Sequence, residues 1–334
     1  MNEPNQEEIM NSLWRTIAVA AAVAALCVSG FGQTAEQPVT LIIEVDNAVL
    51  YRGDVTDSTK LARDPGITTP LPARAFQYTQ AVGDIVAVNG RPAKGLWVTR
   101  TAALSPRINP QPGQSVADFD GDSPAFCFWN ILGPDGNWIG NLLDGGQFPG
   151  SYHTIIGGVG AYYGVSGEHR FLENIRTQRT ASVTEDPANR RINGGGRWRT
   201  IFYIWPKYRP SVDISPTGPA VYHTADFSPV TVTSPARAGE ILTIGARNLG
   251  PTRPELLPPG ARPFKADPIE VVNSPIEVTI GGKEAEVINR IGWPGTYDLY
   301  RVDFRVPSGL PPGQATLQLT AAWIPGPEVK IPVQ

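Results

Sequence analysis

Residues 155–171 read I-I-G-G-V-G-A-Y-Y-G-V-S-G-E-H-R-F, and this stretch decides the fold class. An apolar β-branched pair leads into a run of five glycines, which are Gly157, Gly158, Gly160, Gly164 and Gly167. Glycine tolerates positive φ and allows close approach of two backbones, so such a run is typical of a sharp bend between strands. The stretch therefore predicts a tightly packed β-sheet with a structural glycine corner.

The same glycines could instead bind a dinucleotide, but their spacing does not fit that function. Gly158, Gly160 and Gly164 give G-x-G-x-x-x-G, one residue longer than the dinucleotide fingerprint, and a poor helix start follows them. The chain also lacks the G-x-x-x-x-G-K-S/T sequence of a P-loop. We expect no nucleotide and no other cofactor.

The composition describes a protein with a sizeable core and many turns. Of the 334 residues, 41% are hydrophobic and 18% are charged, and the chain holds 35 glycines and 33 prolines. That content of glycine and proline disfavours helices and suits short strands. The net charge of -3 gives no reason to expect nucleic acid as a partner.

The N-terminal region has the pattern of a secretory signal peptide, to which we assign residues 1–32. Residues 17–31 form an alanine-rich apolar run that is too short to span a bilayer comfortably, and Gly30 and Gly32 suit a signal peptidase. We expect cleavage near Gly32, a secreted location (extracellular, periplasmic or at the cell surface) and no stable membrane span afterwards. An uncleaved anchor is the alternative. The acidic first nine residues leave the true start open between Met1 and Met10.

Strand patterns divide the rest of the chain into three parts. Residues 33–70 hold one alternating strand and a polar linker, and residues 71–209 hold several short strands with glycine corners. Because closure removes exposed sheet edges, the second part predicts a closed β-barrel. Residues 210–334 show clean alternation with turns, which predicts a β-sandwich of immunoglobulin type. The expected fold class is all-β.

Motifs across the middle part resemble the allene oxide cyclase and dirigent barrel. The resemblance covers about residues 71–206 and rests on G-D-I-V (residues 83–86), the strand pair at residues 128–143, the glycine motif at residues 156–167 and the aromatic strand at residues 200–205. It implies an antiparallel barrel of about eight strands that can hold a small apolar ligand. The plant cyclases carry a glutamate on the first barrel strand, whereas residues 73–80 contain no carboxylate. Cyclase chemistry is therefore not carried over.

Motifs in the last part resemble the Solibacter-type C-terminal domain of secreted acidobacterial proteins. They are P-A-V-Y-H-T-A-D-F-S-P (residues 219–229), I-G-G-K-E-A (residues 280–285) and Y-R-V-D-F-R-V-P (residues 300–307). That domain is similar to immunoglobulin-like plexin and transcription-factor domains. The resemblance implies export and a structural or binding role without assigned catalysis.

Motifs for metal binding and nucleophilic catalysis are weak. The segment D-F-D-G-D at residues 118–122 lacks the spacing of an EF-hand, and the three histidines, His153, His169 and His223, lack the spacing of zinc ligands. We therefore expect no metal. Cys127 lies between aromatic residues and is interpreted as a buried core thiol.

Polar residues near the glycine corner are the candidates for a ligand site at the barrel mouth. They are Asp144, Tyr152, His153, Tyr163, Glu168 and Arg170. Glu168 and Arg170 are two residues apart on one strand and so share a face. An apolar pocket with a few convergent polar groups is the usual form of a small-molecule site.

Two functions from different classes follow from these patterns. The favoured one is a secreted two-domain β-protein that acts as a non-catalytic binding or structural module, with a small apolar ligand or an extracellular or cell-surface partner at the barrel. The alternative is a barrel isomerase or cyclase that acts on a small apolar substrate. The first is favoured because the sequence shows no acid–base pair and no catalytic residue can be assigned.

Overall fold

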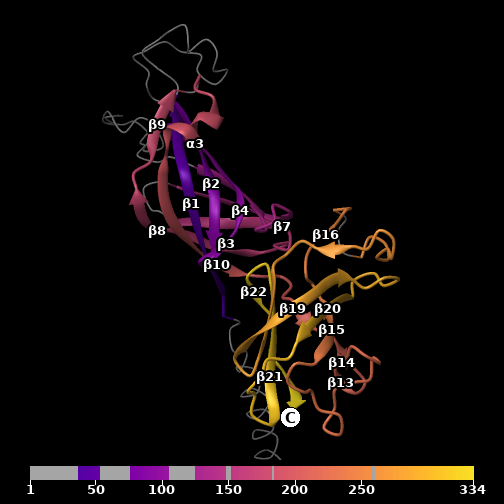
Figure 1. Ribbon diagram of the computed structural model, residues 1–334. Coiled ribbons are helices and arrows are strands. Elements are labelled where there is room, and N and C mark those ends of the chain that lie inside the picture. Colours follow the sequence, from indigo (N-terminus) through magenta and orange to yellow (C-terminus); the bar gives the residue numbers. More distant parts are fainter. Residues whose placement is uncertain (1–36, 53–75, 105–124, 148–151, 183, 257–259) are drawn as a thin grey trace, which may run out of the picture. The chain divides into compact units, whose positions relative to one another are not determined.

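The computed structural model describes residues 37–52, 76–104, 125–147, 152–182, 184–256 and 260–334 (Figure 1). The expected signal peptide and the D-F-D-G-D segment lie outside these residues. Helix in the described part is confined to the short elements η2 (Pro187–Asn189) and α3 (Arg190–Asn193). Neither of these two has the length and apolar character needed to cross a membrane. The described chain is all-β, as predicted.

Eight antiparallel strands close into a barrel, which confirms the prediction for this part of the chain. They are β1 (Val39–Arg52), β2 (Phe76–Val88), β4 (Lys94–Leu104), β5 (Ala125–Leu132), β6 (Trp138–Gln147), β7 (Tyr152–Gly160), β8 (Ser166–Arg176) and β10 (Gly196–Trp205). Strand β1 closes the ring by pairing with both β10 and β2. Two short strands extend the sheet: β3 (Arg91–Pro92) pairs with β2, and β9 (Arg179–Ser182) runs parallel to β1.

Strand β1 belongs to the barrel, whereas the sequence analysis places it in a segment before the barrel. Val39 pairs with Ile204 on β10, and Ile43 pairs with Val88 on β2. Its inward residues, which include Leu41 and Ile43, are fully buried. Alternation shows which face of a strand is buried but does not identify the neighbouring strands, so the sequence separated β1 from its partners.

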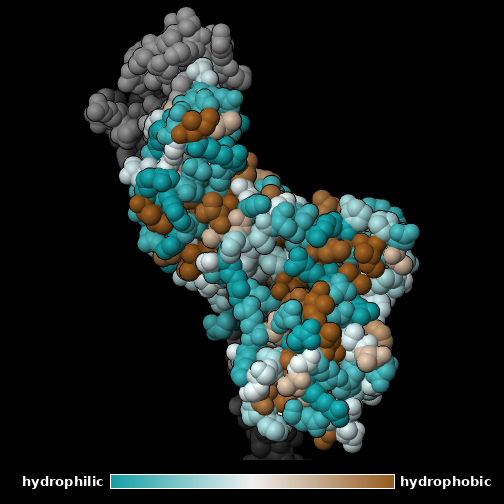
Figure 2. Space-filling view, in the orientation of Figure 1, coloured by the Kyte–Doolittle hydropathy of each residue, from teal (hydrophilic) through white to brown (hydrophobic). Residues whose placement is uncertain are grey.

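Aromatic side chains pack the barrel interior. Trp129 is fully buried, and its ring centroid lies 5.9 Å from those of Trp97 and Trp198 and 5.0 Å from that of Phe202. Trp97 and Trp198 meet edge to face at 4.8 Å. Offset and edge-to-face contacts of this kind are favourable for aromatic pairs. The face of the barrel seen in Figure 2 is mostly hydrophilic.

The glycine run forms the corner between β7 and β8. Gly160 and Gly164 both have φ of +69°, a left-handed conformation that side chains rarely adopt. A Cβ on Gly160 would lie 2.4 Å from the Ile139 carbonyl oxygen, and a Cβ on Gly158 would lie 2.4 Å from the Tyr162 carbonyl oxygen. The corner therefore needs glycine both for its backbone angles and for close packing.

Replacing Gly160 with valine should lower the free energy of unfolding by about 1–3 kcal/mol, because the side chain meets strain and backbone atoms at once. Urea or thermal unfolding measures the loss. The matched control is Gly157→Val, since a Cβ on Gly157 would meet no atom within 4 Å. Equal losses in the two variants, or a rise of the wild-type midpoint with added dinucleotide, would contradict a purely structural corner.

The C-terminal part forms a second antiparallel sheet of seven strands that is nearly closed and barrel-shaped. Its strands in spatial order are β11 (Ser211–Val212), β15 (Ile241–Arg247), β20 (Tyr300–Arg305), β19 (Lys283–Gly292), β18 (Ile276–Ile280), β21 (Gly313–Ala321) and β22 (Ile324–Pro325). Six further strands lie off this path: β12 (Ile214–Ser215), β13 (Gly218–Pro219), β14 (Val221–His223), β16 (Thr252–Arg253), β17 (Val271–Val272) and β23 (Val329–Val333). Of these, β12 and β13 pair only with each other.

The prediction of an antiparallel second domain is confirmed, but its strands form one continuous sheet where two facing sheets were expected. Strand β19 makes the sheet continuous, because its residues 283–285 pair with β18 on one side and its residues 286–292 pair with β20 on the other. Alternating residues such as Val302 and Phe304 on β20 and Leu317 and Leu319 on β21 are fully buried in its core.

Candidate functional site

A buried polar cluster lies inside the barrel, centred on Asp144 of β6. The Trp129 indole Nε1 donates a hydrogen bond to Asp144 Oδ2 at 2.5 Å, and His153 Nδ1 lies 2.5 Å from Asp144 Oδ1. The sheet register produces this arrangement, because β6 lies between β5, which carries Trp129, and β7, which carries His153. Asp144 is 0% exposed, and a buried carboxylate is stable only with such partners.

Two further side chains complete the cluster. His169 on β8 places Nδ1 3.5 Å from Asp144 Oδ1 and stacks its ring on Phe202 at a centroid distance of 4.5 Å. Cys127 on β5 places Sγ 3.7 Å from His153 Nδ1 and donates to Thr99 Oγ1 at 3.2 Å. Cross-strand pairing again explains the positions, since Cys127 pairs with Asp144 and His153 pairs with His169.

The electrostatics of the cluster separate a charged carboxylate from a neutral thiol. Burial raises the pKa of Asp144, but the hydrogen bond with His153 and the charge interactions with His153 and His169 outweigh burial and lower that pKa to about 2. Asp144 is therefore ionised at neutral pH. Burial, together with the Asp144 charge, raises the pKa of the Cys127 thiol well above its ordinary value. A thiol with so high a pKa is a poor nucleophile.

The structure brings Asp144 and His153, two of the six predicted mouth residues, into this cluster. Tyr152, Glu168 and Arg170 lie together on the opposite face of β7 and β8. The Arg170 guanidinium carbon is 4.6 Å from the centre of the Tyr152 ring, and Arg170 forms an ion pair with Glu168 at 2.5 Å. The shared face expected for Glu168 and Arg170 is thus the outer face of the barrel.

Tyr163, the sixth predicted residue, lies in the turn between β7 and β8. Its ring stacks on that of Tyr208 at a centroid distance of 6.5 Å, and Lys207 Nζ lies 5.3 Å from the centre of each ring. Tyr163 is 58% exposed and does not contact the buried cluster. The six candidates therefore fall into three separate places.

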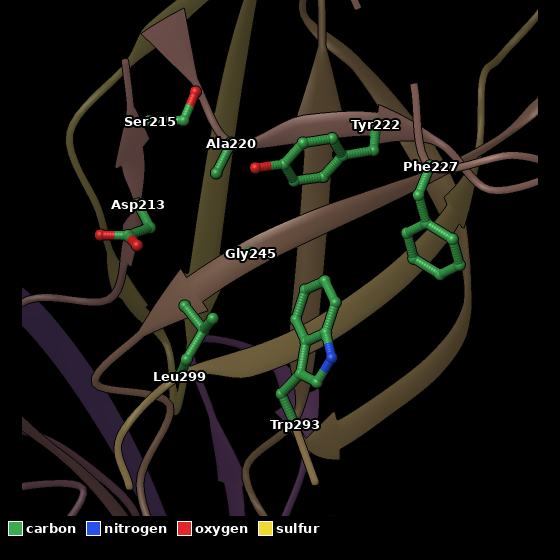
Figure 3. A pocket seen from close by; sticks show the side chains of 8 residues that line it. All are labelled: Asp213, Ser215, Ala220, Tyr222, Phe227, Gly245, Trp293 and Leu299. Atoms are coloured by element: carbon green, nitrogen blue, oxygen red, sulfur yellow. The ribbon is translucent and has the colours of Figure 1, made fainter. Parts of the chain in front are cut away.

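A second candidate site is a cavity of about 340 Å³ in the C-terminal sheet (Figure 3). The residues that line it are Asp213, Ser215, Ala220, Tyr222, Phe227, Gly245, Trp293 and Leu299. Figure 3 shows the rings of Tyr222, Phe227 and Trp293 along one side of the cavity, with Asp213 and Ser215 toward the other. The Phe227 and Trp293 rings are 6.2 Å apart and tilted by 48°.

The aromatic pocket has one polar group held in place by the protein and two that are free to bind a ligand. Arg247 holds the Asp213 carboxylate in two-point fashion, with Nε 2.8 Å from Oδ1 and a terminal nitrogen 3.2 Å from Oδ2. Within the described residues, neither the Tyr222 hydroxyl nor the Trp293 indole nitrogen has a hydrogen-bond partner. The pocket thus combines aromatic walls, an oriented carboxylate and two polar groups that a ligand could engage.

Neither His169 nor any residue of the aromatic pocket was among the six site candidates from the sequence. Alternation carries a signal for His169, because it lies between Glu168 and Arg170 and must point to the opposite face. The pocket residues come from separate loops and strands between residues 213 and 299. The sequence does show aromatic residues in the turn-rich segments that form this pocket, but their spacing does not show that they come together.

The chain matches no family model and no curated protein.

Proposed function

We propose that this protein is an exported, non-catalytic binding protein whose small-molecule site is the aromatic pocket of the C-terminal sheet. The observation that carries the proposal is a cavity of about 340 Å³ walled by Tyr222, Phe227 and Trp293, with the Asp213 carboxylate at its edge. Concave, largely apolar sites with a few placed polar groups are the usual form of small-molecule sites.

The chemistry of the pocket fits a sugar ring or a related polyol. Such a ligand has an apolar C–H face that can pack on an aromatic ring, and hydroxyl groups around its edge. Asp213 can accept hydrogen bonds from hydroxyls, and Tyr222 can donate to or accept from them. Because Arg247 already orients Asp213, less ordering of this side chain is required on binding.

The barrel fits this proposal as a scaffold. Trp97, Trp129 and Trp198 pack against one another inside it, and small barrels are often filled by side chains in this way. A closed eight-stranded barrel is compatible with the allene oxide cyclase and dirigent resemblance, and an antiparallel second domain is compatible with the immunoglobulin-like, Solibacter-type one. The apolar run at residues 17–31 supports export to the cell surface or beyond.

A barrel isomerase or cyclase is the second candidate, and the Asp144–His153 pair favours it. A carboxylate that orients a histidine is a common part of acid–base catalysis. Trp129 and His169 enclose this pair, however, and His153 keeps only 11% of its side chain exposed. A substrate would have to enter a packed core, so the binding proposal is preferred.

Binding of a glycan identified on an array should weaken by at least about tenfold in Trp293→Ala, which corresponds to about 1.4 kcal/mol of lost stacking. Tyr222→Phe removes one hydroxyl and should weaken binding by about three- to tenfold. Isothermal titration calorimetry measures both effects.

The matched control is Tyr297→Ala, because Tyr297 is an exposed aromatic residue of the same segment that does not line the pocket. Its affinity should equal that of the wild type. Absence of glycan binding by the wild type, or equal weakening in Trp293→Ala and Tyr297→Ala, would refute the proposed site.

A further inference from the structure

Three atoms of metal-binding type converge inside the barrel, and a fourth lies beside one of them. Cys127 Sγ, an Asp144 carboxylate oxygen and His153 Nδ1 all lie within 4.8 Å of one another. His169 Nδ1 lies 3.5 Å from Asp144 Oδ1 on the neighbouring strand. The four side chains come from β5, β6, β7 and β8, which are consecutive strands that pair side by side in the closed barrel.

His169 supplies an independent sign that this cluster has a ligand. Its side chain is 10% exposed, and its Nδ1 makes no hydrogen bond with the described residues although it lies close to the Asp144 carboxylate. Leaving a buried polar atom without a partner costs about 1–3 kcal/mol, and native proteins rarely do so. A cation bound between His169 and the other three side chains would provide the partner.

We propose that Cys127, Asp144, His153 and His169 form a four-coordinate zinc site in the barrel. A thiolate, a carboxylate and two imidazoles belong to the ligand types that zinc takes in proteins. The thiolate also disfavours magnesium and calcium, which prefer oxygen ligands. This inference is independent of the aromatic pocket, whose residues belong to the C-terminal part of the chain.

Two of the separations in the cluster match those of a tetrahedral zinc centre. Bond lengths of about 2.3 Å to sulfur and about 2.0–2.1 Å to nitrogen and oxygen place sulfur about 3.6 Å from nitrogen, and nitrogen about 3.4 Å from oxygen. The observed separations are 3.7 Å for Cys127 Sγ to His153 Nδ1 and 3.5 Å for His169 Nδ1 to Asp144 Oδ1. The His153–Asp144 contact of 2.5 Å must open by about 1 Å as the ion replaces the shared proton.

Neighbouring groups already orient the four ligands. The Trp129 indole binds Asp144 Oδ2, so Oδ1 faces the two imidazoles. The Thr99 hydroxyl, 3.2 Å from Cys127 Sγ, can turn to donate to the sulfur once the thiol proton has left. Phe202 fixes the plane of the His169 ring by stacking. Outer contacts of this kind hold metal ligands in position and tune affinity.

The charges of the proposed centre balance. One carboxylate and one thiolate carry two negative charges, which a divalent ion neutralises, while both imidazoles bind as neutral groups. A neutral centre suits a buried position. Zinc binding must displace the proton of the Cys127 thiol, because only the thiolate is a ligand. Binding should therefore release at least one proton per ion.

Cobalt titration of the purified full chain, first stripped with a chelator, tests the site. We expect one Co²⁺ per chain, the intense visible bands of tetrahedral Co²⁺ and a near-ultraviolet thiolate-to-cobalt charge-transfer band, all displaced by Zn²⁺. Cys127→Ser should abolish the charge-transfer band. His169→Phe keeps an aromatic ring on Phe202 but removes a direct ligand, so it should weaken zinc binding by more than the roughly 10–100-fold typical of lost outer contacts.

The matched control is His223→Gln, since His223 pairs with Glu240 in the C-terminal sheet. Its Co²⁺ spectrum and zinc affinity should equal those of the wild type. Absence of the charge-transfer band in the wild type, persistence of the band in Cys127→Ser, or equal zinc affinity in His169→Phe and wild type would overturn the proposal. Thermal melts in chelator identify any variant that fails to fold. If a variant does fail, the wild type alone tests the site: it should bind one Co²⁺ per chain and release at least one proton per ion, and any other result would overturn the proposal.

Discussion

Truncation of Trp129 to alanine should lower the free energy of unfolding by about 3–5 kcal/mol. Trp129 is 0% exposed and contacts Trp97, Trp198 and Phe202 at the centre of the barrel. Alanine there leaves a cavity that strands of a closed barrel cannot collapse to fill. It also removes the indole donor to Asp144. Urea unfolding followed by circular dichroism measures the loss.

The matched control for this truncation is Phe126→Ala. Phe126 lies on the same strand, but its side chain points outward and is 60% exposed. Removing it should change the free energy of unfolding by no more than about 1 kcal/mol. A loss in Phe126→Ala as large as that in Trp129→Ala would show that the barrel interior does not dominate stability.

Replacing Asp144 with alanine should cost about 3 kcal/mol at neutral pH in chelator-treated buffer, because the Trp129 indole and the His153 imidazole each lose a buried acceptor. The cost of this substitution should also depend on pH. The folded-state pKa of Asp144 is about 2, below the ordinary value of 3.8, so ionisation of this group stabilises the folded protein above about pH 4. That contribution, about 2 kcal/mol, is lost as the pH falls from about 4 to about 2.

The difference in unfolding free energy between wild type and Asp144→Ala should therefore shrink by about 2 kcal/mol between pH 5 and pH 2. The control is Glu286→Ala, which removes a carboxylate that is 67% exposed and paired with Arg305 on the surface. That variant should lose less than about 1 kcal/mol. A difference for Asp144→Ala that stays constant with pH would contradict a depressed pKa in the folded state.

The fold was predictable wherever one local rule decided the outcome. The alternation of β10, which buries Trp198, Phe202 and Ile204, is visible in the sequence, and so is the need for glycine at Gly160. The membership of β1 in the barrel was not, because its partners on β10 lie far away in the chain. Strand pairing over such distances is set by the whole sheet and not by any local pattern.

The sites were less predictable than the fold, because their chemistry arises across strands. Asp144 and His153 stood among the candidates, but the sequence offered no reason to join them to Cys127 or His169. Those contacts follow from the pairing of Cys127 with Asp144 and of His153 with His169. Metal-ligand spacing rules describe ligands on one turn or loop, and they do not apply to ligands supplied by four neighbouring strands.

The pairing of β1 with β10 also orders events during synthesis. The first barrel strand to be made is β1, and one of its two neighbours, β10, is the last. Until residues near Trp205 have left the ribosome, β1 has an unpaired edge and the ring cannot close. Contacts of such long range make folding slow. For a chain that is exported, as we propose, this delay is useful. The polypeptide can reach the membrane before the barrel closes, and it can then be translocated in an unfolded state.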